Sequence, residues 1–204
     1  MARAQCASLD AVTIDLRPGL SGLTPEALDR WVADQGQPAY RARQIGDAVW
    51  KDGGVVAAAE MLTLPSALRD ALDAGFQLDT VADTELRIAD GGQTEKALHR
   101  LADGALIESV LMHYPARAGS RERHTLCLSS QAGCAVGCPF CATGELGFGR
   151  DLSIAEILDQ ARNAARRRLE NCLRCRGGKH VFRTAPSTET SDARDRQVPC
   201  QRET

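Results

Sequence analysis

Apolar side chains in the first third of the chain recur every three to four positions, which is the period of an amphipathic helix. Thr24 before Pro25 is a helix-start signal, because threonine caps a first turn and proline suits the first helical position. The pattern predicts three short helices, at 25–35, 40–50 and 65–74. We expect them to pack around Trp31 and Trp50 as a small helical bundle.

The period then changes to the alternation that is typical of strands. Strands are predicted at 76–88, 96–101, 106–114 and 125–129. Asp-Gly-Gly at 90–92 and Asp-Gly at 103–104 are typical of hairpin turns. Ser153 and Glu156 form a capping box that begins a further helix. The apolar stripe expected on that helix is Ile154, Ile157, Leu158 and Ala161. The predicted fold class is therefore α/β.

The composition is that of a globular protein, with 43% apolar and 25% charged residues. The sequence has no run of 18 apolar residues and no apolar signal segment at its start, so we expect a cytoplasmic protein without a membrane anchor. Residues 1–160 hold 14 Lys and Arg against 22 Asp and Glu, whereas 161–204 hold 11 against 5. We expect a helical domain at 1–75, a strand region at 76–162 and a disordered basic tail at 163–204.

Three of the eight cysteines lie close together in the sequence, at Cys134, Cys138 and Cys141, between the last predicted strand and the last predicted helix. This C-x3-C-x2-C spacing lets three thiolates converge on one metal centre, and Gly133 and Gly137 let the backbone fold closely around it. A structural zinc site and a closed iron–sulfur cluster each take four protein ligands. Three ligands leave one coordination position open, as a catalytic centre requires.

The cysteine spacing alone leaves other interpretations open. Clustered cysteines in a chain without a secretion signal are more often metal or redox groups than disulfides. A zinc site could take its fourth ligand from a histidine, Cys127, Cys172 or Cys175. Three cysteines without a metal are the plainest alternative.

The residues around the cysteines narrow this choice. The sequence resembles radical S-adenosylmethionine enzymes, and within them the RNA methyltransferases that act on carbon 2 of adenine. The resemblance covers roughly residues 15–162. The segments that carry it are Gln37–Ile45, Thr94–Leu111, Thr125–Cys134, Cys138–Gly144 and Gly147–Leu152.

The resemblance implies a 4Fe–4S cluster held by Cys134, Cys138 and Cys141, with S-adenosylmethionine at its fourth iron. It also implies 23S rRNA and tRNA as substrates, and an electron donor such as flavodoxin. The fold that it implies is a helical accessory domain, a short β-hairpin region and then the first strand, loop and helix of a radical S-adenosylmethionine (β/α) barrel.

Two further residues acquire roles only through the resemblance. Glu108 matches the family's proton acceptor, and Cys127 matches the cysteine that pairs transiently in a disulfide with the methyl-carrying cysteine. Without the resemblance, Glu108 is an exposed strand residue and Cys127 a small buried one. No family motif surrounds Cys172, Cys175 or Cys200, so the methyl-carrying role is assigned to none of them.

The sequence after about residue 162 matches no family motif, and one strand and one helix cannot close a barrel. We therefore expect an incomplete or frameshifted family member with doubtful activity of its own. The rival interpretation of the tail is a basic arm that binds RNA phosphates. The rival functions are a non-catalytic RNA-binding module and a zinc-stabilised module.

Overall fold

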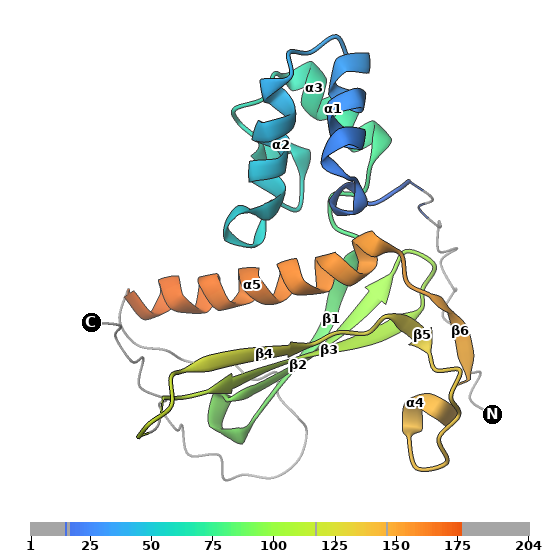
Figure 1. Ribbon diagram of the computed structural model, residues 1–204, viewed down its shortest axis with the longest axis vertical. Helices are drawn as coiled ribbons and strands as arrows, with labels where there is room; N and C mark the ends of the chain where they lie inside the picture. Colours follow the sequence, from blue (N-terminus) through green and yellow to red (C-terminus); the bar gives the residue numbers. More distant parts are fainter. Residues whose placement is uncertain (1–14, 16, 117, 146, 177–204) are drawn as a thin grey trace, which may run out of the picture.

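The computed structural model describes residue 15 and residues 17–116, 118–145 and 147–176, with side chains placed at all of these except 83, 84 and 170–176. Three helices form one end of the molecule, and a four-stranded sheet forms the other (Figure 1). A long helix, α5, lies across one face of the sheet, between the sheet and the three helices (Figure 1).

The three predicted helices form, close to their expected boundaries: α1 (Pro25–Asp34), α2 (Tyr40–Trp50) and α3 (Ser66–Gly75). Thr24 caps α1, because its hydroxyl accepts a hydrogen bond from the Ala27 amide at 3.2 Å. The helices bury Val32, Ile45 and Leu72 in a common core with residues of the short 3-10 turns η1 (Leu20–Gly22) and η3 (Ala58–Glu60).

The two tryptophans differ in their surroundings. Trp31 packs edge-on against Phe76, with ring centroids 5.3 Å apart, at the rim of the helical core. Trp50 is 51% exposed, so the prediction that it helps to form the core is wrong. It is the last residue of α2, and the core side chains of that helix are Ala42, Ile45 and Val49.

Four antiparallel strands form the sheet, in the order β1 (Val81–Ala89), β2 (Thr94–Leu101), β3 (Leu106–Tyr114) and β4 (Arg123–Cys127). The predicted glycine turns join them, the first as the 3-10 turn η4 (Asp90–Gly92). The first strand begins five residues later than predicted, because Phe76 and Leu78 are buried in the helical core instead. Among the described residues, the one parallel bridge joins Gly19 to Gln77, so these strands do not test the barrel prediction.

The segment predicted as a plain loop between the last strand and the last helix contains regular structure. A two-stranded ribbon, β5 (Gln131–Gly133) with β6 (Phe148–Asp151), encloses one turn of helix, α4 (Ala142–Glu145). The backbone of Gly133 has φ +78°, and a Cβ there would lie 2.0 Å from the carbonyl oxygen of Gly147. Only glycine therefore lets the ribbon close at this point.

Helix α5 (Ile154–Arg176) begins where the capping box predicts. The Ser153 amide donates to the Glu156 carboxylate at 2.7 Å, and the Glu156 amide donates to the Ser153 hydroxyl at 3.2 Å. The helix continues past 162, where the sequence predicted a disordered tail to begin. Residues 163–169 continue the helix. Asn163 and Ala164 are buried, because α5 packs here between the sheet and the helical core. The rest of the predicted tail, 177–204, lies outside the described residues.

The buried face of α5 is largely polar, so the apolar stripe predicted for it holds only in part: Ile157 packs against the core of the sheet, whereas Ile154 does not. Ile154 is 66% exposed, whereas the buried residues include Asp159, Gln160, Arg162 and Asn163. These side chains form hydrogen bonds with backbone and other polar groups of the neighbouring elements. Hydrogen bonds, not hydrophobic contact alone, therefore hold the helix in place.

Arg162 joins three parts of the chain to α5. Its guanidinium donates to the carbonyl oxygens of Val49 at 3.0 Å, Leu78 at 2.9 Å and Val55 at 2.7 Å. It also pairs with the Asp159 carboxylate at 2.5 Å. The other oxygen of that carboxylate accepts from the Thr80 amide at 2.9 Å and the Thr80 hydroxyl at 2.8 Å.

A second, partly buried carboxylate, Asp79, extends this network. It accepts from Arg166 at 2.9 Å and from the Asn163 amide group at 3.2 Å. Burial, and next the charge of Asp159, raise the pKa of Asp79 above its ordinary value. The 3-10 turn η2 (Lys51–Gly53) also packs flush on α5, since a Cβ on Gly53 would lie 2.6 Å from the Arg166 backbone.

No helix among the described residues combines the length and apolarity that crossing a membrane requires.

Candidate functional site

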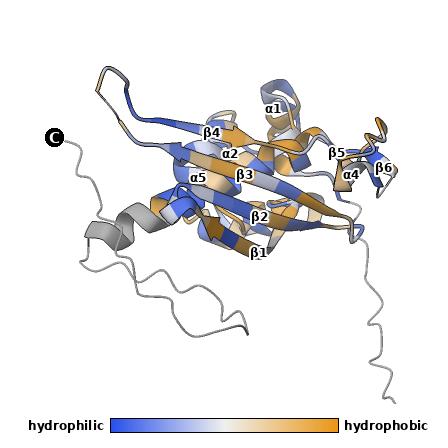
Figure 2. Cartoon of the chain, turned by 90° about the horizontal axis from the view of Figure 1, so that it is seen from below, coloured by the Kyte–Doolittle hydropathy of each residue, from blue (hydrophilic) through white to orange (hydrophobic). Residues whose placement is uncertain are grey.

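The face of the sheet opposite α5 carries two of the five predicted site residues, Glu108 and Cys127. Burial alternates along β2 and β3, because every second side chain points toward α5. The intervening side chains point to the opposite face, which Figure 2 shows from below. We call this face the open face. Its side chains include Glu85, Arg87, Lys96, Leu98, Glu108, Val110 and Cys127.

Glu108 lies on the open face near the start of β3 and is half-exposed. Its carboxylate pairs with the Lys96 ammonium group of β2 at 2.7 Å, and both side chains are 47% exposed. A carboxylate in this position is accessible to a substrate and has a cation beside it. Lys96 is a candidate site residue that the sequence analysis missed, since it belongs to no motif that marks chemistry.

Cys127 lies at the end of β4, directly opposite Val110 of β3. Since cross-strand partners point to the same side, Cys127 shares the open face with Glu108, two residues along β3. Cys127 is exposed rather than buried. The Ser129 hydroxyl donates to the Glu108 carbonyl oxygen at 2.8 Å and so ties the two strands together at this end of the sheet.

The cysteine loop, 134–141, follows directly after the first strand of the ribbon. The Cys134 amide donates to the Gly147 carbonyl oxygen at 2.9 Å and anchors the start of the loop. The Cys141 amide donates to the Cys138 carbonyl oxygen at 3.1 Å and closes a turn within the loop. Gly144 packs against the Cys138 backbone, where a Cβ would lie 3.0 Å from the amide nitrogen. All three cysteines are partly exposed free thiols.

The chemistry of this loop fits a metal cluster bound through sulfur. Hydrogen bonds from the backbone amides of Gly144 and Thr143 lower the pKa of the Cys141 thiol, which favours the thiolate that binds metal. Cysteine thiolates are also the donors that iron–sulfur clusters take. Nevertheless, no group of three His, Cys, Asp or Glu in the described part of the chain is arranged to hold a metal ion. The loop therefore supplies suitable sulfur donors for a cluster, but these donors are not already arranged around a metal position.

The four described cysteines, including Cys127, are all free, so the structure does not support the expected disulfide. Cys172, Cys175 and Cys200 lack described side chains, and Cys200 lies outside the described residues altogether.

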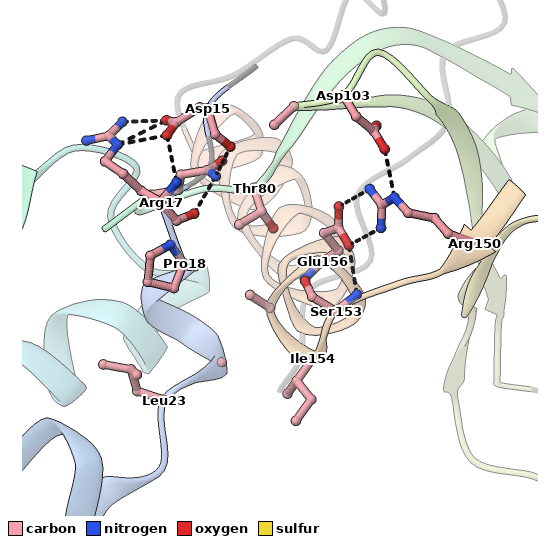
Figure 3. Close-up of a pocket in the computed structure, with 15 residues that line it drawn as sticks. Asp15, Arg17, Pro18, Leu23, Thr80, Asp103, Arg150, Ser153, Ile154 and Glu156 are labelled. Carbon is pink, nitrogen blue, oxygen red and sulfur yellow. Dashed lines mark hydrogen bonds and ion pairs between the residues drawn. The ribbon is translucent and has the colours of Figure 1, made fainter. Parts of the chain in front are cut away.

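Arg150 holds the ribbon against both the sheet and α5 (Figure 3). Its guanidinium pairs with Asp103, in the turn between β2 and β3, at 2.7 Å and with Glu156 of α5 at 2.7 Å. Burial of Glu156 opposes ionisation, but the hydrogen bonds from Arg150 and Ser153 prevail and lower its pKa. These residues line a pocket of about 530 Å³ whose charged groups pair with one another. Arg150 thus ties the ribbon around the cysteine loop to the sheet and to α5.

Comparisons with known proteins agree with the resemblance found in the sequence. Three curated proteins, each called a probable dual-specificity RNA methyltransferase RlmN, come from Roseiflexus sp. (strain RS-1), Mycolicibacterium paratuberculosis and Heliobacterium modesticaldum. Their identities to this chain are 44% over 163 residues, 44% over 156 and 49% over 141. These matches cover 78%, 73% and 69% of this chain, but 39%, 40% and 36% of the relatives.

A solved structure is also similar, the crystal structure of a radical SAM methyltransferase from Sphaerobacter thermophilus. It superposes with a TM-score of 0.69 at 40% identity, over 76% of this chain and 43% of that one. No family model matches the chain. The chain thus spans about two fifths of the length of the proteins that it matches.

Proposed function

We propose, from the chain's homology to the RlmN group of radical S-adenosylmethionine RNA methyltransferases, that it takes part in methylating carbon 2 of an adenine in 23S rRNA and tRNA. By family the chain is an enzyme. Because it spans about two fifths of its relatives, the complete reaction, its RNA substrates and a flavodoxin-like electron donor all belong to this proposal. RNA substrates also favour the cytoplasm as its location.

The observation that carries the proposal is the placement of the chemical groups at one end of the sheet. Glu108 and Cys127 share the open face, and the cysteine loop follows β4 after a few residues. Chemistry at the carboxyl end of a strand, on the loop that leads to a helix, is typical of β/α enzymes.

In this proposal Cys134, Cys138 and Cys141 hold a 4Fe–4S cluster. When bound, such a cluster with an open iron position supplies the electron that cleaves S-adenosylmethionine. The ribbon keeps the three thiols in one loop, and the pairing of Arg150 with Asp103 and Glu156 keeps that loop at the end of the sheet.

Glu108 takes the proton that leaves carbon 2 of the adenine after the new carbon–carbon bond forms. A carboxylate is suited to this role when it is ionised and within reach of the proton. The Lys96 ammonium group lies 2.7 Å from this carboxylate, so a cation accompanies Glu108 at the site. Cys127 faces the same space, where its thiol can pair with a methyl-carrying cysteine; we assign that partner to no residue of this chain.

Metal analysis after anaerobic reconstitution tests the proposal. We expect about four iron and four sulfide per chain, and a change in the reduced spectrum when S-adenosylmethionine is added. Replacing Cys134, Cys138 or Cys141 singly by Ala should abolish the cluster, whereas Cys127→Ala, the matched control, should retain it. Zinc without labile sulfide would refute the proposal and favour the zinc-stabilised module.

The RNA part of the proposal needs its own measurement. We expect filter binding of tRNA that weakens as salt rises, because phosphate contacts release counterions. RNA binding without any cluster would favour the non-catalytic RNA-binding module, and absence of binding even at low salt would exclude both RNA proposals for this chain.

A further inference from the structure

Two histidines meet on the face of the sheet that α5 covers, at the end far from the cysteine loop. His113 of β3 and His124 of β4 are direct cross-strand partners. Their Nδ1 atoms lie 2.7 Å apart, with the rings edge to face. Both side chains are largely buried, at 21% and 22% exposure. The site that we propose for methylation uses neither residue.

Each ring also faces a carboxylate through its other nitrogen. His113 Nε2 lies 3.4 Å from the buried Glu95 of β2, and His124 Nε2 lies 3.1 Å from Glu122 in the segment before β4. Arginines of α5 complete the surroundings: Arg167 Nε lies 4.0 Å from Glu95, and Arg168 acts on His124 through its charge.

Hydrogen-bond geometry limits how many protons this pair holds. A contact of 2.7 Å between two Nδ1 atoms requires that one of them donates and the other accepts. If both rings were neutral, the donating ring would have a bare Nε2 facing the oxygen of a carboxylate, and two acceptors would oppose each other. One additional proton removes this conflict, because three hydrogens then serve three hydrogen bonds.

We propose that His113 and His124 share one extra proton as an imidazolium–imidazole pair that fastens the start of β4 to the end of β3, and that a second proton opens this contact. His113 is the charged ring, because its Nε2 faces the most deeply buried carboxylate of the cluster, Glu95. His124 is the neutral ring, which accepts through Nδ1 and donates through Nε2 to Glu122.

The electrostatics of His124 agree with this assignment. Burial, followed by the positive charge of Arg168 and then by His113, lowers the pKa of His124 below its ordinary value. With a second proton, both Nδ1 atoms would carry hydrogens at a distance that only a donor and an acceptor can share. The strands then separate at this end, at His124, three positions before Cys127 on β4.

A metal ion between the two Nδ1 atoms is the alternative, since two imidazoles backed by carboxylates resemble a metal-binding arrangement. The surroundings favour a proton instead. No third ligand joins the histidines among the residues that the structure describes, and two arginines of α5 lie close by. A dication would be repelled by these charges more strongly than a single proton.

Nitrogen-15 NMR of the imidazole rings in the full chain tests the proposal. At pH 7 we expect His113 to carry hydrogen on both nitrogens and His124 on Nε2 alone. As pH falls, His124 should take up the second proton below the ordinary value of about 6.5. The amide signals of 123–126 should broaden or shift in the same step.

Three variants sharpen the experiment. His113→Gln and His124→Gln should each abolish the two-step titration, and His180→Gln, the matched control outside the described residues, should leave it unchanged. If a variant does not fold, the wild-type spectra still decide. Two neutral rings at pH 7 that titrate together near 6.5 would overturn the proposal. So would micromolar zinc chloride that displaces the shared proton and shifts both Nδ1 signals, because the pair would then be a metal site.

Discussion

Replacing Arg162 by Met tests whether directional bonds hold α5 between the helical core and the sheet. The substitution keeps a long apolar stem but removes four hydrogen bonds, three of them to backbone carbonyls. Arg162 is 4% exposed and its partner Asp159 is fully buried, so the substitution leaves a buried charge without its cation. Loss of one partner of such a pair costs about 3–5 kcal/mol.

The structure places the expected cost in the lower part of that range. Asp159 keeps its two hydrogen bonds from Thr80, which continue to stabilise the carboxylate. We therefore expect Arg162→Met to lower the free energy of unfolding by about 3 kcal/mol, a large share of the 5–15 kcal/mol that is usual for a domain. Adding Asp159→Asn should recover part of this loss, because the orphaned charge disappears.

Urea denaturation followed by circular dichroism measures both effects. Arg87→Met is the matched control, because Arg87 forms an exposed pair with Glu85, and its replacement should leave the midpoint unchanged. A loss below about 1 kcal/mol for Arg162→Met would contradict the buried network. The network would also be contradicted if the double variant, Arg162→Met with Asp159→Asn, lost more stability than the two single variants lose together.

Three further predictions concern charge and backbone shape. The raised pKa of Asp79 means that the folded state binds the proton of this carboxyl more tightly than the unfolded state does. The free energy of unfolding of the wild type, compared with that of Asp79→Asn in urea titrations, should therefore fall as pH rises above about 4. Glu156 has the opposite sign: its lowered pKa predicts that Glu156→Gln costs about 1–3 kcal/mol at pH 7, and that this difference is lost as pH falls below about 4. Gly133→Ala should prevent iron loading, since its Cβ would meet a carbonyl oxygen at 2.0 Å. Gly46→Ala, the matched control, has open space in a helix and should add up to about 1 kcal/mol of stability. Iron analysis and urea midpoints of both variants check these expectations.

Local signals in the sequence predicted the elements whose boundaries are set locally. The second helix, Tyr40–Trp50, and the third strand, Leu106–Tyr114, form as expected, because a glycine or another turn residue lies at one or both of their ends. The ribbon around the cysteines was missed, since strands of three and four residues are too short to show a period.

The candidate site was predictable residue by residue but not as an arrangement. Motif similarity singled out Glu108 and Cys127 without showing that they share a face. That fact depends on the register of β3 and β4, in which Val110 opposes Cys127. Register follows from the pairing of whole strands, so a one-residue shift would have put the two groups on opposite faces. The pairing of Lys96 with Glu108 depends in the same way on the register of β2.

The polar face of α5 shows why helical periodicity was misleading. Hydrophobic patterns identify a buried face only where the neighbours are apolar. Here the neighbours offer carbonyl oxygens of Val49, Val55 and Leu78, which lie 84 to 113 residues away along the chain, and a guanidinium satisfies them better than leucine could.

This polar contact has a consequence for the cysteine loop. Helix α5 begins at the end of the ribbon that encloses the loop, and Glu156 on its first turn holds Arg150 of that ribbon. One turn further on, Asp159 and Arg162 hold the helical core. Directional bonds therefore join the loop and the helical core through about two turns of one helix. If the helical core contacts RNA, the distance from that contact to the cysteines is set by these side chains, and Arg162→Met should loosen it even where the sheet stays folded.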